Sequence, residues 1–198
     1  MEDLHLIVGL GNPGEEYART RHNAGYLLVE LLARNWRASW EDAPKLQSRV
    51  ARMDAGGRRC LLCKPWTYMN ESGVAVGAAA QYYRVPLDRM LVVADDADLP
   101  LGEIRLRPRG SSGGHHGLES VERHVGGREY ARLRLGIGRR ADGGRQITDH
   151  VLGRFNRDEA VVFEKVLDVA GEQVVCWLAS GIEMAMNRYN GVAVAPAT

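Results

Sequence analysis

The chain has 198 residues, 45% of them hydrophobic and 26% charged, so it is long and apolar enough for one sizeable globular domain. The net charge of +1 gives no overall attraction to nucleic acid, and the odd count of three cysteines suggests no disulfide framework. No apolar run approaches the roughly 20 residues that span a bilayer, and the acidic start lacks the features of a signal peptide, so we expect a cytoplasmic protein.

Strand-like and helix-like segments alternate along the chain, which predicts a single α/β domain. The predicted strands are 4–10, the two arms of a hairpin over 48–65 that turns at Gly56-Gly57, 90–95, 103–109 and 131–138. The predicted helices are 24–36, 71–84 and about 157–180. We expect the domain to cover residues 1–190, with a loose tail over 191–198. The pattern leaves the strand order open.

Cys60 and Cys63 have the CxxC spacing of metal and redox sites, but they lie in an apolar run that is typical of a strand. Positions three apart on a strand point to opposite faces, so the two thiols would not converge. Reactive thiols need a polar, electropositive environment. We therefore expect buried, unreactive cysteines.

Residues Gly9 to Gly14 match the pattern G-x-G-x-x-G directly after the first predicted strand. That pattern is typical of dinucleotide-binding enzymes, so a nicotinamide oxidoreductase is one hypothesis. Glu15 and Glu16 oppose it because a pyrophosphate needs positive potential, and the first helix starts too late, near Ala24, to direct its N-terminus at a phosphate. No acidic residue ends a second strand about 20 residues further on. A tight glycine turn without a ligand is the simpler alternative.

Two polar segments precede predicted helices and are candidate sites. His22 lies in the loop between the first strand and the first helix, and sites gather at strand ends in α/β sheets. Tyr68, Met69 and Asn70 come just before the helix at 71, where Asn70 could equally serve as a helix N-cap. A purely structural role stays open for both segments.

Three carboxylates, Asp95, Asp96 and Asp98, follow the strand that ends near residue 94. Together they would suit a metal ion, which would recruit further ligands. Alternatively, one carboxylate holds a histidine in one tautomer and stabilises its charged form, as in hydrolases. The sequence leaves both interpretations open.

The segment from Ser111 to Gly117 is a glycine-rich loop that contains His115 and His116. Its glycines allow the backbone to approach a ligand closely. Adjacent histidines are potential zinc ligands, but no matching cysteine or histidine spacing occurs elsewhere, so we expect no metal.

Residues 105–140 contain nine arginines and three glutamates, a local balance of +6 inside a near-neutral chain. Guanidinium groups on one face of a strand suit phosphate, although a solvated sheet edge protected by charge has the same pattern. The arginines that alternate along the two predicted strands are Arg105, Arg107, Arg109, Arg132 and Arg134.

Taken together, these motifs resemble the bacterial peptidyl-tRNA hydrolase family. The matching segments are VGLGNPGEEYARTRHNAG, KPWTYMNESG, VVADDADLPLGEIRLRPRGSSGGHHGLES, YARLRLGIGR and DHVLGRF. Their order and spacing from Leu6 to about Asn187 make the match specific. The resemblance implies a monomeric α/β domain with a mixed, twisted sheet surrounded by helices. It also implies a cytosolic enzyme without cofactor or metal, which recycles peptidyl-tRNA dropped by stalled ribosomes by hydrolysing the ester bond between peptide and tRNA.

The resemblance also implies functional residues, position by position. His22 resembles the general base that activates water, and Asp95 its orienting partner. The other matches are the amides that hold peptide and water, Asn12 and Asn70; the walls around the 3′-terminal aminoacyl-adenosine, Tyr17, Tyr68 and Met69; and the basic residues that clamp tRNA phosphate, Arg107 and Arg134.

Three positions depart from the family pattern. His116 replaces an asparagine that the family normally carries, which affects one contact to substrate and water. Ala94 and Ala97 flank the acidic cluster where bulkier residues are common, and we expect them to affect packing only. The change at His116 keeps a non-catalytic RNA-binding relative as an alternative, which the retained pair of His22 and Asp95 opposes.

Overall fold

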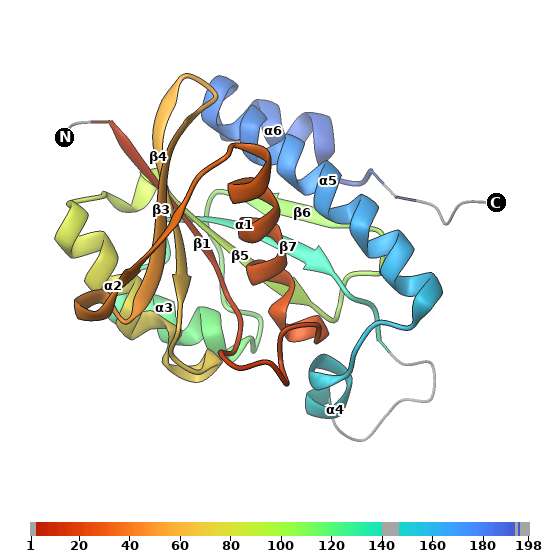
Figure 1. The fold of residues 1–198 in the computed structure, drawn as a ribbon. Helices are drawn as coiled ribbons and strands as arrows, with labels where there is room; N and C mark the ends of the chain where they lie inside the picture. The colour runs from red at the N-terminus through yellow and green to blue at the C-terminus, as the bar shows by residue number, and fades with distance from the viewer. Residues whose placement is uncertain (1–2, 140–146, 193, 195–198) are drawn as a thin grey trace.

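The computed structural model describes residues 3–139, 147–192 and 194, which form a seven-stranded sheet between two layers of helices (Figure 1). The strands are β1 Leu4–Gly9, β2 Trp40–Ala43, β3 Ser48–Ala55, β4 Arg58–Pro65, β5 Met90–Asp96, β6 Ile104–Arg107 and β7 Ala131–Gly136. The helices are α1 Ala24–Asn35, α2 Ser72–Tyr83, α3 His116–Val125, α4 Ile147–Leu152, α5 Arg157–Ser180 and α6 Ile182–Tyr189.

The order of the strands is β2-β3-β4-β1-β5-β7-β6. The four central strands β4, β1, β5 and β7 are parallel, and the pairs β2–β3, β3–β4 and β6–β7 are antiparallel. The expected single domain with a mixed sheet is thus confirmed. Because the parallel strands end at the same edge, the loops that follow β1, β4 and β5 lie near one another there.

Each face of the sheet has its own hydrophobic core. Ile7, Leu91 and Leu133 contribute to the core beneath α1, α5 and α6, whereas Val8 and Val92 contribute to the core beneath α2 and α3 (Figure 1). This division follows from the alternation of side chains along a strand.

The glycines at and just beyond the end of β1 allow α1 to pack closely against the strand. A Cβ atom on Gly9 would lie 2.2 Å from the carbonyl oxygen of Gly25 in α1, and one on Gly11 would lie 2.6 Å from the Tyr26 ring. Only glycine permits such contacts. α1 begins at Ala24, as expected, well after the glycine segment. The G-x-G pattern therefore has a packing role here.

The two cysteines of the CxxC pattern lie on opposite faces of β4, as predicted. Cys60 is buried in the core beneath α1 and α5, and Cys63 in the core beneath α2 and α3. Burial raises the pKa of each thiol to about 12. Both thiols therefore stay protonated and unreactive at neutral pH.

The sequence analysis gave no bounds for four of the helices and strands: β2, α3, α4 and α6. β2 is a short edge strand whose central residues Glu41 and Asp42 are exposed, so it lacks an apolar pattern. α4 has only six residues, too few to show a helical period. α6 is separated from α5 by Gly181, whose φ of +85° ends the longer helix.

The C-terminal segment closes the free edge of β6. The Asn190 side chain accepts a hydrogen bond from the backbone N–H of Leu106 at 2.8 Å and donates one to its carbonyl at 3.0 Å. Of the predicted loose tail, the N–H of Val194 donates to the carbonyl of Gly102 at 2.9 Å. Residues 193 and 195–198 lie outside the described residues. No helix in the described part of the chain is long and apolar enough to cross a membrane.

Candidate active site

A pocket of about 450 Å³ opens at the edge of the sheet where β1, β4 and β5 end. The predicted site residues that line it are Asn12, His22, Tyr68, Met69, Asn70, Asp95, His116 and Arg134. The pocket therefore brings together residues that lie far apart in the sequence. Tyr17 and Arg107, which were also predicted, do not line it.

The loop that carries His22 is held at both sides. His22 lies in a short 3-10 helix, Arg21–Asn23. The Arg21 guanidinium forms an ion pair with Glu159 at 2.7 Å. The Asn23 side chain accepts a hydrogen bond from the backbone N–H of Asn12 at 2.8 Å and donates to its carbonyl at 3.0 Å. These contacts fix the position of His22 relative to the end of β1.

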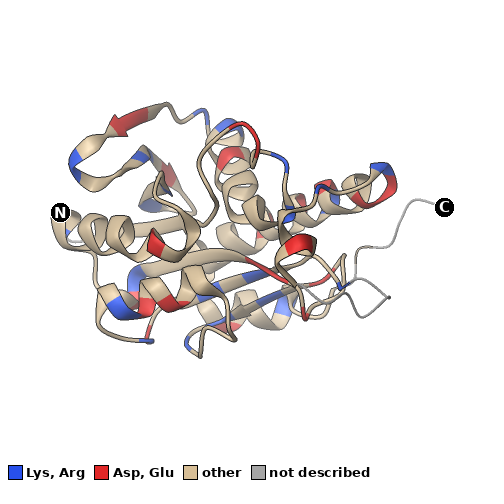
Figure 2. Cartoon of the chain, turned by 90° about the horizontal axis from the view of Figure 1, so that it is seen from below, with Lys and Arg blue, Asp and Glu red and all other residues tan. Residues whose placement is uncertain are grey.

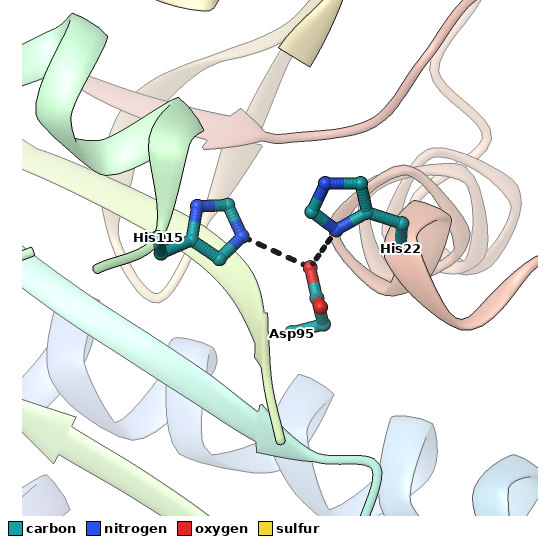
Figure 3. A group of neighbouring side chains, drawn as sticks. All are labelled: His22, Asp95 and His115. Atoms are coloured by element: carbon teal, nitrogen blue, oxygen red, sulfur yellow. Dashed lines mark hydrogen bonds and ion pairs between the residues drawn. The ribbon is translucent and has the colours of Figure 1, made fainter. Parts of the chain in front are cut away.

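His22 faces the carboxylate of Asp95 at the end of β5 (Figure 3). Nδ1 of His22 lies 2.8 Å from Oδ1 of Asp95. Because an ionised carboxylate can only accept, the imidazole donates its Nδ1 proton. Nε2 then carries the lone pair and is free to accept a proton, as the base of a hydrolase must.

The Asp95 carboxylate is stabilised in its charged form. Burial raises its pKa, since only 3% of the side chain is exposed, but the hydrogen bonds that His115 and His22 donate to the carboxylate outweigh that effect. The pKa of Asp95 is held well below its usual range. The carboxylate is therefore ionised at neutral pH.

His115 is a functional residue that the sequence analysis did not assign to the site. Its Nε2 lies 3.0 Å from the same Oδ1 of Asp95, opposite His22 (Figure 3). Its Nδ1 accepts hydrogen bonds from the N–H groups of Gly117 and Leu118, so the ring is the N-cap of α3. An acceptor at Nδ1 requires the proton at Nε2, so His115 is the tautomer that donates to Asp95. The sequence signal that could have indicated a role for His115 was its position directly before a helix, where an N-cap residue lies.

The side chains of His22, Asp95 and His115 place three potential metal ligands within 4.8 Å of one another. Coordination by an imidazole nitrogen requires a free lone pair on that nitrogen. At His115 the nitrogen facing Asp95 carries a proton, because the other nitrogen caps α3. A metal ion would have to displace this proton and break the cap. The geometry therefore favours a hydrogen-bonded triad over a metal centre.

Asn12 provides an oriented amide in the pocket. Its Oδ1 accepts a hydrogen bond from the backbone N–H of Met69 at 2.7 Å, which assigns the oxygen and the nitrogen of the amide. Nδ2 has no hydrogen-bond partner among the described residues. This NH₂ group can donate to an oxygen of a bound substrate.

Apolar side chains form two opposite walls. Tyr68 and Met69 precede α2 on one side, and Ile147, Val151 and Leu152 from α4 form the other. The alternative role of Asn70 as an N-cap is not observed, because Glu71 occupies the N-cap of α2 and no side chain caps that helix. Asn70 is exposed at the pocket instead.

His116 lies at the exposed part of the pocket lining, and Tyr17 lies outside the lining. The His116 side chain is 76% exposed, and its Nδ1 lies 3.3 Å from Oε2 of Glu119. Tyr17 is half-buried outside the pocket lining. Direct contact with a substrate stays a prediction for both residues.

The five arginines that alternate along the two predicted strands lie in different environments. In Figure 2, basic segments (blue) occur on strands of the sheet, and the register of β6 and β7 pairs Arg105 with Arg134 and Arg107 with Arg132. Arg105 and Arg107 are exposed and form no ion pair with a described residue. Arg109 lies beyond the end of β6 and pairs with Glu129, so it does not share the strand face that was predicted for it.

The prediction that Arg132 belongs to an exposed stripe was wrong. Its side chain is only 2% exposed and pairs with Glu122 of α3 at 3.2 Å. Its guanidinium also lies 4.1 Å from the centre of the Tyr130 ring. The alternation of residues along a strand indicates which face of the sheet a side chain occupies, but it does not indicate whether a helix covers that face.

A histidine that is oriented by a carboxylate, with a free nitrogen and a nearby amide donor, defines a site of the hydrolase type. Comparison with known proteins specifies the family. The family model described as "Peptidyl-tRNA hydrolase" matches residues 6–197. The chain is 46% identical over 188 residues to the peptidyl-tRNA hydrolase of Gloeobacter violaceus, covering 95% of this chain and 94% of the relative. It is 42% identical to that of Geobacillus kaustophilus, covering 94% of this chain and all of the relative.

The solved structures agree. The crystal structure of peptidyl-tRNA hydrolase from Acinetobacter baumannii superposes with a TM-score of 0.91 at 38% identity, covering 98% of each chain. The chain therefore belongs to the peptidyl-tRNA hydrolase family.

Proposed function

We propose that this protein hydrolyses the ester bond of peptidyl-tRNA, releasing peptide and free tRNA, with His22 as the general base. The observation that carries the proposal is the 2.8 Å contact between Nδ1 of His22 and Oδ1 of Asp95, which leaves Nε2 directed away from the carboxylate. Membership of the peptidyl-tRNA hydrolase family specifies the bond that this base serves to cleave.

The reaction begins with a water molecule hydrogen-bonded to Nε2 of His22. The imidazole takes a proton as the water oxygen bonds to the ester carbonyl carbon, and the Asp95 carboxylate stabilises the resulting imidazolium. The tetrahedral intermediate carries a negative oxygen, to which Nδ2 of Asn12 and the amide of Asn70 donate. The ester bond then breaks, and His22 returns the proton to the leaving ribose hydroxyl.

The walls of the pocket suit the two halves of the substrate. Tyr68 and Met69 offer an aromatic and a flexible thioether surface for the terminal adenosine. α4 offers aliphatic side chains on the opposite side. An enzyme that accepts peptides of any sequence needs such general contacts in place of a selective side-chain cavity.

The tRNA body extends toward the exposed arginines of β6. Arg105 and Arg107 are free to bind phosphate oxygens because no described acidic side chain neutralises them. We further propose that the enzyme acts as a monomer in the cytoplasm, and the fact that His22, Asp95, Asn12 and the pocket walls lie in one chain agrees with a monomer.

Hydrolysis of N-acetyl-aminoacyl-tRNA in the presence of EDTA tests this proposal. We expect release of free tRNA at the same rate with and without the chelator. Binding of the tRNA without turnover would instead favour a non-catalytic RNA-binding protein. Binding of a nicotinamide dinucleotide without hydrolysis would favour the oxidoreductase alternative.

A further inference from the structure

Arg134 of β7 holds two parts of the active site together. Its Nη1 donates to Oδ2 of Asp96 at 3.1 Å, and its Nη2 donates to the carbonyl oxygens of Ser111 and Ser112 at 2.9 and 2.8 Å. The side chain is 16% exposed, and the Asp96 side chain 9%. The guanidinium group is therefore engaged within the protein.

The partners of Arg134 lie in two segments, and each segment contains a residue of the His22–Asp95–His115 triad. Asp96 follows Asp95 directly at the end of β5, and its Oδ1 accepts the N–H of Asp98 at 2.8 Å. The carbonyl of Ser112, which Arg134 holds, also accepts the N–H of His115 at 3.2 Å. Arg134 thus links the strand end that carries Asp95 to the loop that carries His115.

The glycine-rich loop is shaped to lie on this guanidinium. Gly113 has a φ of +62°, and a Cβ atom there would lie 3.3 Å from both terminal nitrogens of Arg134. The planar guanidinium fork can hold an acid and two carbonyls at once, which a lysine ammonium cannot do in the same geometry. The contact is specific to arginine.

The neighbouring Arg105, directly opposite Arg134 in the register of β6 and β7, provides the contrast. Arg105 is exposed and has no ion-pair partner among the described residues, which is the state expected of a phosphate-binding side chain. Arg134 has three intramolecular acceptors and lines the pocket.

We infer that Arg134 is a positioning residue for catalysis: it sets the contact between His115 and Asp95, and through it the orientation of His22, independently of any phosphate. This inference rests on the proposed function. A phosphate clamp would act on the affinity for tRNA, whereas a positioning residue acts on the rate of the chemical step.

The test uses a substrate without phosphate, 3′-O-(N-acetylaminoacyl)adenosine, beside N-acetyl-aminoacyl-tRNA at saturating concentration. We expect Arg134→Ala to lower kcat by about tenfold or more on both substrates, since small misplacements of catalytic groups have effects of this size. Arg134→Lys should recover only part of the rate. The matched control is Arg49→Ala, which removes an arginine of β3 that pairs with Asp42 at the opposite edge of the sheet, and should leave kcat unchanged.

Two further measurements separate positioning from general destabilisation. Asp96→Asn removes the charge partner without altering Arg134 and should also lower kcat; it replaces Arg134→Ala if that variant does not fold. The ¹⁵N NMR shifts of His115 should show a mixture of tautomers in Arg134→Ala. The inference is overturned if Arg134→Ala raises KM for tRNA while kcat is unchanged on both substrates. A parent enzyme that hydrolyses neither substrate would instead refute the proposed function.

Discussion

Arg107 and Arg132 lie directly opposite one another across β6 and β7, yet only Arg107 reaches solvent. The Arg132 guanidinium is covered by α3 and bound to Glu122. Two arginines with the same spacing in the sequence therefore have different roles. Arg107 is available to a phosphate, and Arg132 stabilises the packing of α3 on the sheet.

We predict that Arg107→Ala raises KM for N-acetyl-aminoacyl-tRNA and flattens its dependence on salt. Loss of one phosphate contact reduces the slope of log KM against log salt concentration by roughly one unit. Steady-state kinetics between low and moderate salt measure this slope. A slope equal to that of the parent would show that Arg107 belongs to a solvated sheet edge.

We predict that Arg132→Ala lowers the free energy of unfolding by about 1–3 kcal/mol, because it removes a buried guanidinium that packs against the Tyr130 ring and pairs with Glu122, while Glu122 keeps its ion pair with the exposed Arg128. Arg107→Ala, the exposed control on the facing strand, should change this free energy by less than about 0.5 kcal/mol. Urea unfolding of both variants provides the comparison. Equal stability of the two variants would contradict the assignment of Arg132 to the core.

We predict that kcat/KM depends differently on pH in the parent and in His116→Asn. A neutral imidazole offers one donor and one acceptor and partly replaces the family's asparagine, but protonation removes the acceptor. We therefore expect kcat/KM of the parent to fall more steeply on the acid side than that of His116→Asn. His22 is present in both proteins, so the comparison isolates position 116. Superimposable profiles would mean that this exposed ring makes no contact with the substrate.

The lowered pKa of Asp95 predicts how stability responds to acid. A carboxyl whose pKa is depressed by folding contributes stability above its unfolded pKa, near 3.9, and loses it as the pH falls toward the folded pKa. The difference in unfolding free energy between the parent and Asp95→Asn should therefore narrow by about 1 kcal/mol between pH 4 and pH 3. Urea unfolding at the two pH values measures it. A constant difference would show that the Asp95 carboxylate is not stabilised in the folded state.

The sequence predicted those elements and site residues that have a signal in the local pattern of residues. The strands and long helices followed from their apolar periods. His22 and Asp95 were candidates because they lie near strand ends, and their roles came from the resemblance to the peptidyl-tRNA hydrolase family. The polar segments converge in one pocket because the parallel strands carrying them end at one edge, but the strand order that produces this convergence had no local signal.

The parts that were missed depend on contacts between distant segments. His116 was assigned to the site because it replaces an asparagine of the family pattern. His115 was not assigned, because the hydrogen bonds that define its role come from α3 and β5. The burial of Arg132 likewise depends on α3. A pattern along one strand contains neither contact.

The central claim is that His22 and Asp95 act as one base. Its most direct test is kcat on saturating N-acetyl-aminoacyl-tRNA at neutral pH for the parent, His22→Ala, Asp95→Asn and the double variant, with folding verified by circular dichroism. We predict that His22→Ala lowers kcat by about 10²–10⁴-fold. Because Asp95 acts through His22, the double variant should be no slower than His22→Ala alone. Losses that multiply in the double variant, or a His22→Ala variant as fast as the parent, would contradict the claim.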